Sequence, residues 1–325
     1  MPEITNLHEL PRFRDGISYL YVEHAVVERE ASSIAVYRRE GAFQIPAAAL
    51  GVLLLGPGTR ITHAAIRALS ECGVTVLWVG EEAGRFYATG IGETRSARRL
   101  YRQVRAWARP RERLEVVKRL YRFRFDEKLS EDLTIEELRG REGVRVREAY
   151  ARASRETGVP WKGRNYRRGA WEDADAVNRA LSAGAAFLYG LCHAAIVSAG
   201  YSPALGFIHV GKQLSFVYDV ADLYKTRVLI PAAFRTVAES EEGVERRIRY
   251  RLRDTVRESE MLKCIVDDIN RLFVGLGFKA LNKEEEEESV WAEDPAAPGR
   301  LWDPDGEVPS GLNYAQEDTS GGDDS

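Results

Sequence analysis

The chain has 325 residues, of which 44% are hydrophobic and 30% charged, a composition typical of a globular protein with more than one domain. We find no continuous run of about 18 uncharged apolar residues and no basic segment followed by an apolar one at the N-terminus, so neither a membrane-spanning helix nor a secretory signal is expected. The cysteines Cys72, Cys192 and Cys264 are widely spaced and form no CxxC pattern. They are predicted to be small buried side chains in a reducing compartment, which favours a cytoplasmic protein.

The net charge of −3 hides a strong asymmetry along the chain. Residues 283–325 hold 2 Lys or Arg and 14 Asp or Glu, a net charge of −12, which leaves +9 on residues 1–282. This acidic tail begins with KEEEEE and shows no hydrophobic periodicity afterwards. We expect it to be disordered, because such a composition buries too little apolar surface to become ordered.

Residues 1–92 are predicted to form an N-terminal β-rich domain. Short runs rich in Val, Ile, Leu and Tyr alternate with glycines, as in strands joined by turns, and they lie at 17–30, 33–47, 50–56, 73–80 and 84–92. Between them, residues 61–73 have apolar side chains at helical spacing and end in Gly, which predicts one helix. The preceding GPGTR is either a plain turn or a phosphate contact that involves Arg60.

Residues 93–282 are predicted to form a C-terminal helical domain. Apolar residues recur every three or four positions in the segments 113–129, 134–158, 175–200 and 241–256. The segment 175–200 is apolar around most of its circumference, which predicts the central buried helix of this domain. The fold class is therefore α+β, with a β-rich domain followed by a mainly α-helical one.

Arginine dominates residues 95–125, which contain 12 basic and 2 acidic side chains with aromatic residues between them. A solvated helix face with inward-facing aromatics would explain this pattern, but such a helix normally carries more glutamates for ion pairing. A polyanionic partner is therefore favoured. If about six of these charges met phosphates, log K would fall with log salt concentration with a slope of roughly −5.

Four side chains are candidates for the chemistry. Asp219 and Asp222 lie in the apolar stretch FVYDVADLY, where unpaired carboxylates would be costly to bury. If residues 214–225 are helical, their i,i+3 spacing puts both carboxylates on one face. His209 lies in a turn-like position between GFI and VGK, and Glu142 lies between two glycines in LRGREGVR. Carboxylates and an imidazole without cysteine suit Mg²⁺ or Mn²⁺.

Each candidate also has an ordinary structural explanation. Asp219 could cap a helix, Asp222 could pair with Lys225, and Glu142 could pair with an arginine of its own helix. A single histidine beside an apolar run is more often structural than a ligand. The metal hypothesis is favoured because a divalent cation compensates buried carboxylates. Such an ion would polarise a phosphodiester and activate a water or a 3′-hydroxyl for attack.

A further segment, WKGRNYRRGAW at residues 161–171, mixes arginine and aromatic side chains without a regular period. This mixture suits stacking on an unpaired base, and an ordinary surface loop is the alternative. The sequence contains no GxGxxG fingerprint, P-loop, HExxH or GxSxG motif. Nucleotide-dependent and serine-hydrolase chemistry therefore have no support in the sequence.

Three segments together resemble the Cas1 family, the CRISPR-associated integrase-endonucleases that capture new spacers. They are residues 54–90, 138–151 (LRGREGVRVREAYA) and 188–225, which include LGFIHVGKQLSFVYDVADLYK. The resemblance covers about residues 10–280, is nearest to the I-E subtype, and excludes the acidic tail. It implies an N-terminal domain for dimerisation and partner contact, a C-terminal catalytic domain, a homodimer, and a complex with Cas2.

The resemblance also implies roles for individual residues. Glu142, His209 and Asp222 match the ligands of Mg²⁺ or Mn²⁺, and Asp219 matches a further catalytic acidic position. His209 would also assist proton transfer, and Lys212 would neutralise charge near the scissile phosphate. The basic and aromatic positions that match DNA-handling residues are Arg60, Arg85, Arg164, Tyr166, Trp171, Tyr189, Lys212 and Lys225.

The implied reaction is a transesterification on double-stranded DNA. The 3′-hydroxyl of a prespacer attacks a phosphodiester at the leader–repeat boundary, and one phosphodiester replaces another, so no ATP site is needed. Two alternatives stay open at the level of the sequence. One is a structure-selective nuclease for branched DNA, in which water replaces the 3′-hydroxyl; the other is a non-catalytic DNA-binding scaffold.

Overall fold

The computed structural model describes residues 19–81, 85–90, 97–125, 127–130, 132–164, 174–259, 261–276, 301–303 and 306–308. Its contacts divide the chain into two units, Met1–Ala280 and Leu281–Ser325. In the second unit, β9 (Leu301–Asp303) pairs with β10 (Gly306–Val308) in an antiparallel ribbon. The expected boundary at residues 92 and 93, and most of the acidic tail, lie outside the described residues.

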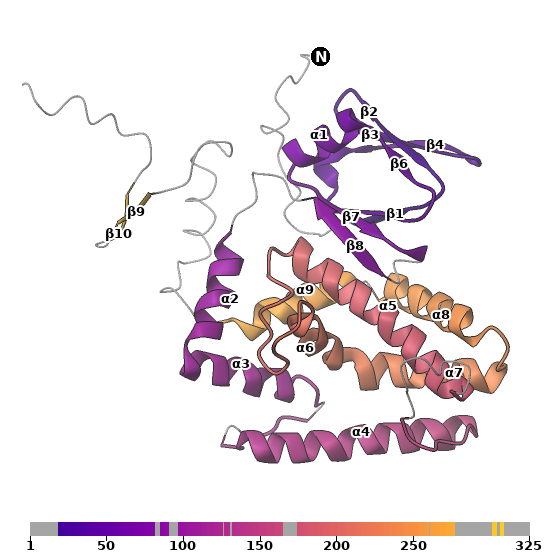
Figure 1. Cartoon of the computed structure of the whole chain (residues 1–325), viewed down its shortest axis with the longest axis vertical. Coiled ribbons are helices and arrows are strands. Elements are labelled where there is room, and N and C mark those ends of the chain that lie inside the picture. The colour runs from indigo at the N-terminus through magenta and orange to yellow at the C-terminus, as the bar shows by residue number, and fades with distance from the viewer. Residues whose placement is uncertain are drawn as a thin grey trace, which may run out of the picture. The chain divides into compact units, whose positions relative to one another are not determined.

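Two four-stranded sheets form the β-rich region (Figure 1). The first has the order β1 (Tyr19–Val22), β5 (Val52–Leu55), β7 (Thr75–Val79) and β8 (Phe86–Gly90), and only β8 is antiparallel to its neighbour. The second has the order β4 (Gly41–Pro46), β3 (Ser33–Arg38), β2 (Val26–Glu30) and β6 (Arg60–Ile61). The central strand β5 has the sequence VLLL and is buried throughout, as expected for a strand covered on both faces.

The predicted helix between the strands is α1 (His63–Glu71), followed by the turn at Gly73. It begins at Thr62, whose hydroxyl accepts a hydrogen bond from the N–H of Ala65 at 3.3 Å. Leu69 of α1 packs in one apolar cluster with residues of both sheets, such as Val27 and Leu53. This helix therefore closes the core of the β-rich region.

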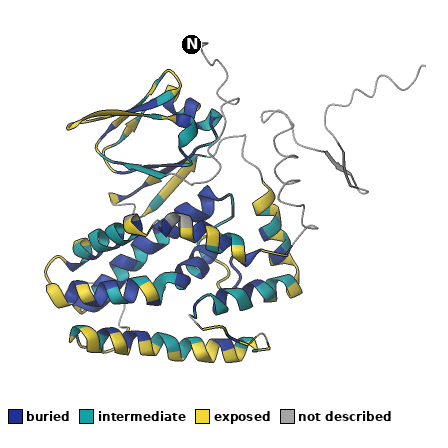
Figure 2. Cartoon of the chain, turned by 180° about the vertical axis from the view of Figure 1, so that it is seen from behind, coloured by how far each residue is buried: buried dark blue, intermediate teal, exposed yellow. Residues whose placement is uncertain are grey.

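Helices make up most of the described residues from 97 to 276, so the predicted α+β fold class is confirmed (Figure 1). They are α2 (Arg98–Ala108), α3 (Pro110–Arg122), α4 (Ile135–Thr157), α5 (Ala176–Ser198), α6 (Ser215–Tyr224), α7 (Ile230–Glu239), α8 (Val244–Glu258) and α9 (Met261–Leu272). α5 contacts α6, α7, α8 and α9 and is mostly buried (Figure 2). The predicted central helix is therefore confirmed.

α5 is also the helix, among the described residues, that is long and apolar enough to cross a membrane. Its most apolar 18-residue window is 72% buried inside the protein. The expectation that no stretch of this length and composition exists was thus wrong for α5. Contact with four neighbouring helices accounts for its apolar surface.

The cysteine prediction needs one correction. Cys72 and Cys192 are buried as expected, but Cys264 is exposed on α9. Its neighbours Ile265 and Ile269 take the buried face of that helix, which leaves position 264 on the solvent side.

Local signals explain the length and position of α4. Thr134 and Glu137 form a reciprocal capping box at its start, and Gly158 ends it with a left-handed backbone at φ 71°. One side of the helix is exposed along its length (Figure 2). Leu138, Ala149 and Ala153 point into the core, so the polar side chains between them are placed at the edge of the packed helices.

A π-helix, Lys225–Leu229, joins α6 to α7. Pro231 follows it and lacks the N–H that a continuous helix would use at this junction, so the hydrogen-bond ladder changes here. Wide turns of this kind often occur at functional sites. The junction presents Lys225 and Thr226 toward the residues described next.

Candidate active site

Asp219 binds the chain segment that precedes its own helix. Its carboxylate is completely buried. Oδ2 accepts hydrogen bonds from the N–H groups of Phe207 at 2.6 Å and Ile208 at 3.1 Å, and Oδ1 accepts one from the N–H of His209 at 2.9 Å. Because both oxygens are occupied, Asp219 fixes the backbone of residues 207–209 on α6 and is not exposed to a metal or substrate.

The imidazole of His209 is held by the same carboxylate. Its Nδ1 lies 2.7 Å from Oδ1 of Asp219, so the proton belongs on Nδ1 and the lone pair on Nε2. This hydrogen bond raises the pKa of His209, although partial burial acts in the opposite direction. Fixing one ring nitrogen so that the other can bind a metal is the usual role of a carboxylate behind a ligand histidine.

Gly206 permits this loop to approach α6 so closely. A Cβ at this position would fall on the carbonyl oxygen of His209 and 2.6 Å from Cβ of Ser215. Only glycine fits without moving the backbone. Gly206 was not among the residues predicted from the sequence, although a glycine three positions before the candidate ligand His209 was the available signal.

Glu142 is paired along its own helix, as one structural alternative proposed. Arg145 donates from Nε to Oε2 at 2.8 Å and from Nη2 to Oε1 at 3.1 Å. The third nitrogen, Nη1, donates to the hydroxyl of Thr226 at 2.5 Å. Arg145 therefore ties α4 to the π-helix and holds Glu142 in one orientation.

A second arginine, Arg124, lies between Glu142 and Asp222. Its Nη1 is 3.4 Å from Oε1 of Glu142, and its Nη2 is 3.6 Å from Oδ2 of Asp222. Only 5% of its side chain is exposed. Asp222 also has Lys225 near it, with 3.9 Å between Nζ and Oδ1, so the predicted alternative pair is present as well.

His209 belongs to the same electrostatic group. The negative charge of Asp222 raises the pKa of His209, and the positive charge of Arg124 lowers it. Both groups therefore lie within Coulombic reach of the imidazole. Glu142 and Asp222 thus both contact Arg124, and His209, with Asp219 behind it, lies within Coulombic range of Asp222 and Arg124. Asp219 and Asp222 share a helix but have different environments, because loop N–H groups occupy only the first.

These residues fit a divalent cation by their chemistry. Among the described residues, no three His, Cys, Asp or Glu side chains stand close enough together to hold a metal ion directly. Arg124 lies where two of them would meet, and its Nε and Nη2 are buried without a hydrogen-bond partner. Two carboxylates and the Nε2 of His209 are suitable ligands for Mg²⁺ or Mn²⁺ once this cationic group gives way.

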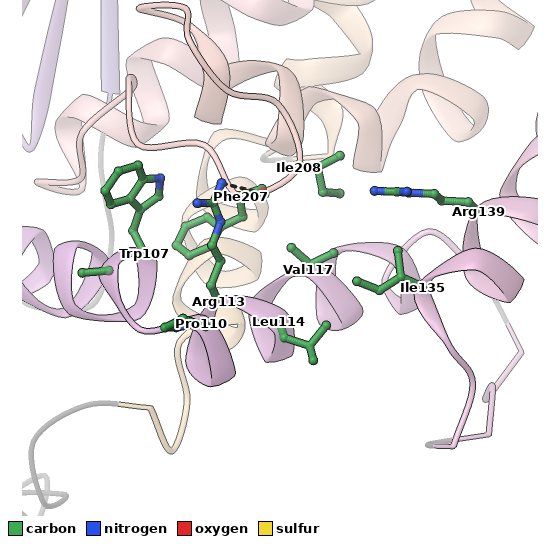
Figure 3. Close-up of a pocket in the computed structure, with 10 residues that line it drawn as sticks. Trp107, Pro110, Arg113, Leu114, Val117, Ile135, Arg139, Phe207 and Ile208 are labelled. Atoms are coloured by element: carbon green, nitrogen blue, oxygen red, sulfur yellow. Dashed lines mark hydrogen bonds between the residues drawn. The ribbon is translucent and has the colours of Figure 1, made fainter.

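An open pocket of about 500 Å³ adjoins the loop that carries His209 (Figure 3). Trp107 donates from Nε1 to the carbonyl of Gly206 at 3.1 Å, and Arg113 donates to the carbonyl of Phe207 at 3.4 Å. The guanidinium of Arg113 also lies 5.3 Å from the centre of the Trp107 ring. Helices α2 and α3 thus present an aromatic and cationic surface beside the site.

The arginine-rich segment forms α2 and α3, which are separated by Arg109, and Pro110 is the first residue of α3. Its two glutamates are used more fully than expected: Glu112 pairs with both Arg105 and Arg109, and Glu115 pairs with Arg119. Arg124 is internal. Fewer basic side chains are therefore available to a polyanionic partner than the sequence suggested. Those available are the arginines that remain exposed, such as Arg111.

The DNA-handling candidates have different positions. Tyr189 of α5 lies edge-on to Tyr218 with ring centres 5.0 Å apart, and burial, together with the charge of Asp222, raises its pKa to about 12. Lys225 contacts Asp222, and Lys212 is exposed in the loop after His209. These three candidates border the site.

The other candidates do not share one location. Arg60 and Arg85 are exposed residues of the β-rich region. Arg164 donates to the carbonyl and side-chain oxygens of Asn178, both at 3.1 Å, and to Ser182. Its guanidinium therefore anchors the preceding loop to α5. Tyr166 and Trp171 lie outside the described residues.

Comparison with known proteins agrees with the resemblance seen in the sequence. The family model for the CRISPR associated protein Cas1 matches residues 18–128 and 122–259. The chain is 63% identical over 325 residues to "CRISPR-associated endonuclease Cas1 2" of Thermus thermophilus, covering 99% of this chain and 98% of the relative. It is 37% identical over 262 residues to "CRISPR-associated endonuclease Cas1" of Escherichia coli, covering 80% and 85%.

A solved structure supports the same assignment. The crystal structure of a TtCas1–DNA complex superposes with a TM-score of 0.76 at 67% identity, covering 82% of this chain and 100% of the other. The matching regions include every element of the candidate site from α3 to the π-helix. The chain belongs to the CRISPR-associated Cas1 family.

Proposed function

We propose that this chain is a metal-dependent DNA endonuclease and integrase of CRISPR adaptation, which joins prespacer 3′-hydroxyl ends to the leader–repeat by transesterification. The observation that carries the proposal is that Glu142 and Asp222 both contact the buried Arg124, while His209, fixed by Asp219, lies within Coulombic range of Asp222. The relatives in this family are named endonucleases, and one of them is solved with DNA. Both facts support a nucleic-acid substrate.

Glu142, His209 and Asp222 would hold Mg²⁺ or Mn²⁺, which polarises the scissile phosphodiester when bound. Asp219 keeps the proton of His209 on Nδ1 and thereby leaves Nε2 available. Arg145 orients Glu142 through two hydrogen bonds. Lys212 and Lys225 add positive charge where the phosphate backbone would lie. His209 assists proton transfer to the leaving oxygen when it is not needed as a ligand.

The aromatic and cationic surface beside the site suits a strand end. Trp107 and Arg113 border the pocket next to the His209 loop (Figure 3). Bases stack on aromatic rings with little regard to sequence. Tyr218, whose ring centre lies 5.8 Å from that of His209, and Tyr189 beside it supply further ring surface. We assign these residues to holding the DNA that Glu142, His209 and Asp222 act on.

The assembly we propose is a homodimer that works with Cas2 in the cytoplasm, with residues 1–92 in the dimer and partner contacts and residues 93–282 in catalysis. The I-E subtype is the nearest resemblance. An apolar cluster formed by the two sheets and α1 supports this division, and a second cluster packs β5 and β7 against α5. The acidic tail, 283–325, is proposed to limit contact of the basic body with non-specific DNA.

The test is strand transfer of a labelled duplex with 3′ overhangs into a supercoiled plasmid that carries a leader and a repeat. The reaction is run with the Cas2 partner in Mg²⁺, in Mn²⁺ and in EDTA. Joined product that requires the metal supports the integrase. Metal-dependent nicking or branch cleavage without joining would instead support a structure-selective nuclease, and DNA binding without chemistry would leave a scaffold.

A further inference from the structure

Arg124 is an unusual group to find inside a metal site. Its side chain is 95% buried, because 5% is exposed, and its neighbours Glu142 and Asp222 are 13% and 23% exposed. It comes from the segment just after α3, where Arg124 N–H is bonded to the carbonyl of Tyr121, and its guanidinium lies over the Tyr121 ring at 5.0 Å. The turn after α3 thus places the Arg124 guanidinium between the carboxylates of Glu142 on α4 and Asp222 on α6.

The contacts of Arg124 are loose. The distances of 3.4 Å to Glu142 and 3.6 Å to Asp222 exceed the 2.7–2.9 Å of a strong charged hydrogen bond by roughly 0.6 Å. Nε and Nη2 are buried without a hydrogen-bond partner. A buried guanidinium with unfilled donors is poorly compensated. In contrast, Arg145 uses three nitrogens at 2.5–3.1 Å on Glu142 and Thr226.

The two arginines therefore have different tasks. Arg145 orients Glu142 and is anchored by the hydroxyl of Thr226. Arg124 is the one that reaches both carboxylates. Without a positive charge between them, Glu142 and Asp222 would repel each other across a partly buried space. A divalent cation placed there would meet the charge of Arg124 and be repelled by it.

We propose that Arg124 is a built-in counter-cation, a positioning residue that holds Glu142 and Asp222 together in the metal-free protein and competes with the divalent ion for their oxygens. This inference rests on the proposed metal site. Arg124 stabilises the empty site and weakens metal binding, so metal affinity reflects an exchange of one cation for another. The metal-free site is thereby kept folded, and its affinity for the divalent ion is lower.

The test uses the full chain and Mn²⁺ alone, without DNA. Arg124→Met keeps most of the apolar stem and removes the charge. Calorimetric titration with Mn²⁺ should show binding about tenfold tighter than in the wild type, the factor expected when one charged contact no longer has to be displaced. Thermal unfolding in EDTA should show a lower midpoint temperature, and saturating Mn²⁺ should raise this midpoint more than in the wild type.

Two control variants separate the possible failures. Arg119→Met removes a partly buried arginine that pairs with Glu115, and its Mn²⁺ affinity should equal that of the wild type. Glu142→Gln should lose most Mn²⁺ binding. If the wild type and Glu142→Gln bind Mn²⁺ equally, or neither binds, the proposed metal site itself is wrong, and this inference falls with it.

Binding of Mn²⁺ by the wild type but not by Glu142→Gln supports the metal site. If Arg124→Met then binds Mn²⁺ no more tightly than the wild type, the counter-cation role of Arg124 is overturned. Should Arg124→Met fail to fold in EDTA, Arg124→Lys decides, because a lysine keeps the charge but lacks the fork that reaches both carboxylates. It should bind Mn²⁺ more tightly than the wild type. Equal or weaker binding by Arg124→Lys would overturn the proposal.

Discussion

Asp219 holds His209 twice, through the backbone N–H at 2.9 Å and through Nδ1 of the ring at 2.7 Å, both on the same oxygen. The other oxygen binds the N–H groups of Phe207 and Ile208. One buried carboxylate therefore sets the loop, the ring orientation and the tautomer together. We therefore assign Asp219 to positioning the loop, whereas the side chains of Glu142 and Asp222 remain partly exposed.

Replacing Asp219 by Asn should separate these roles. The amide keeps the size of the carboxylate but carries no charge. Its NH₂ group would face loop N–H groups that are themselves donors, so those hydrogen bonds are lost. We expect a loss of stability of about 2–3 kcal/mol, the value of hydrogen bonds to a charged group, and Mn²⁺ binding weaker by about 10–100-fold. Thermal unfolding and calorimetric titration measure both.

The matched control is Asp267→Asn on the exposed side of α9, which should change neither quantity. His209→Ala should lose Mn²⁺ affinity with a smaller change in stability, because the carboxylate keeps its three backbone donors. An Asp219→Asn protein with wild-type melting and wild-type Mn²⁺ affinity would refute the positioning role.

Gly206 should be intolerant of any side chain. Gly206→Ala places a methyl group against the carbonyl of His209 and the start of α6, so the loop must shift and strand transfer should fall by about tenfold or more. Gly211→Ala is the control, because its added Cβ meets open space, although its φ of 79° makes alanine strained.

Gly211→Ala should therefore lose about 1 kcal/mol of stability and keep most of its strand-transfer activity. Both variants are compared by thermal unfolding and by initial rates of strand transfer. Equal activity in the two variants would show that the close approach at Gly206 has no bearing on the site.

His193 should make stability depend on pH. It lies on α5 with its ring 3.7 Å from the centre of the Phe86 ring, and burial lowers its pKa from 6.5 to about 4. The unfolded chain therefore binds a proton at a higher pH than the folded chain does. The contribution of His193 to the free energy of unfolding is complete above about pH 6.5 and is lost as the pH falls toward 4.

His193→Phe keeps a ring against Phe86 and removes the titration. Between pH 7 and pH 5, the midpoint temperature of the wild type should fall more than that of His193→Phe. The other histidines are common to both proteins, so the difference between the two curves isolates His193. Parallel curves would show that His193 is not buried neutral in the folded protein.

Removal of residues 283–325 should change how the protein meets DNA. The deletion removes a net charge of −12 from a body that carries +9, so non-specific affinity should rise and its salt dependence should steepen. Filter binding or fluorescence anisotropy with a random duplex at several salt concentrations measures this effect. If affinity for random DNA stays unchanged, the tail does not have the proposed role.

Much of the fold could be predicted because it depends on local patterns. Strand runs, the Thr134 cap and the apolar circumference of α5 are each visible within a few neighbouring residues. Glu142, His209 and Asp222 were also candidates from the sequence; the structure places the first and last beside Arg124, and His209 within Coulombic range of Asp222.

The positions of the arginines could not be predicted in this way. Arg124 and Arg164 looked like members of basic segments, but their partners lie 14–98 residues away, at Asn178, Glu142 and Asp222. Only the packing of helices determines such pairs. The same holds for Asp219, whose backbone donors belong to a loop that Gly206 allows to pack closely.

The central claim is that Glu142, His209 and Asp222 carry out strand transfer on DNA. The most direct measurement compares the wild type with His209→Ala and Asp222→Ala for prespacer binding and for joining to a leader–repeat plasmid in Mn²⁺ with Cas2. We expect DNA binding close to that of the wild type and no joined product for either variant. Joined product at the wild-type rate from both variants would contradict it.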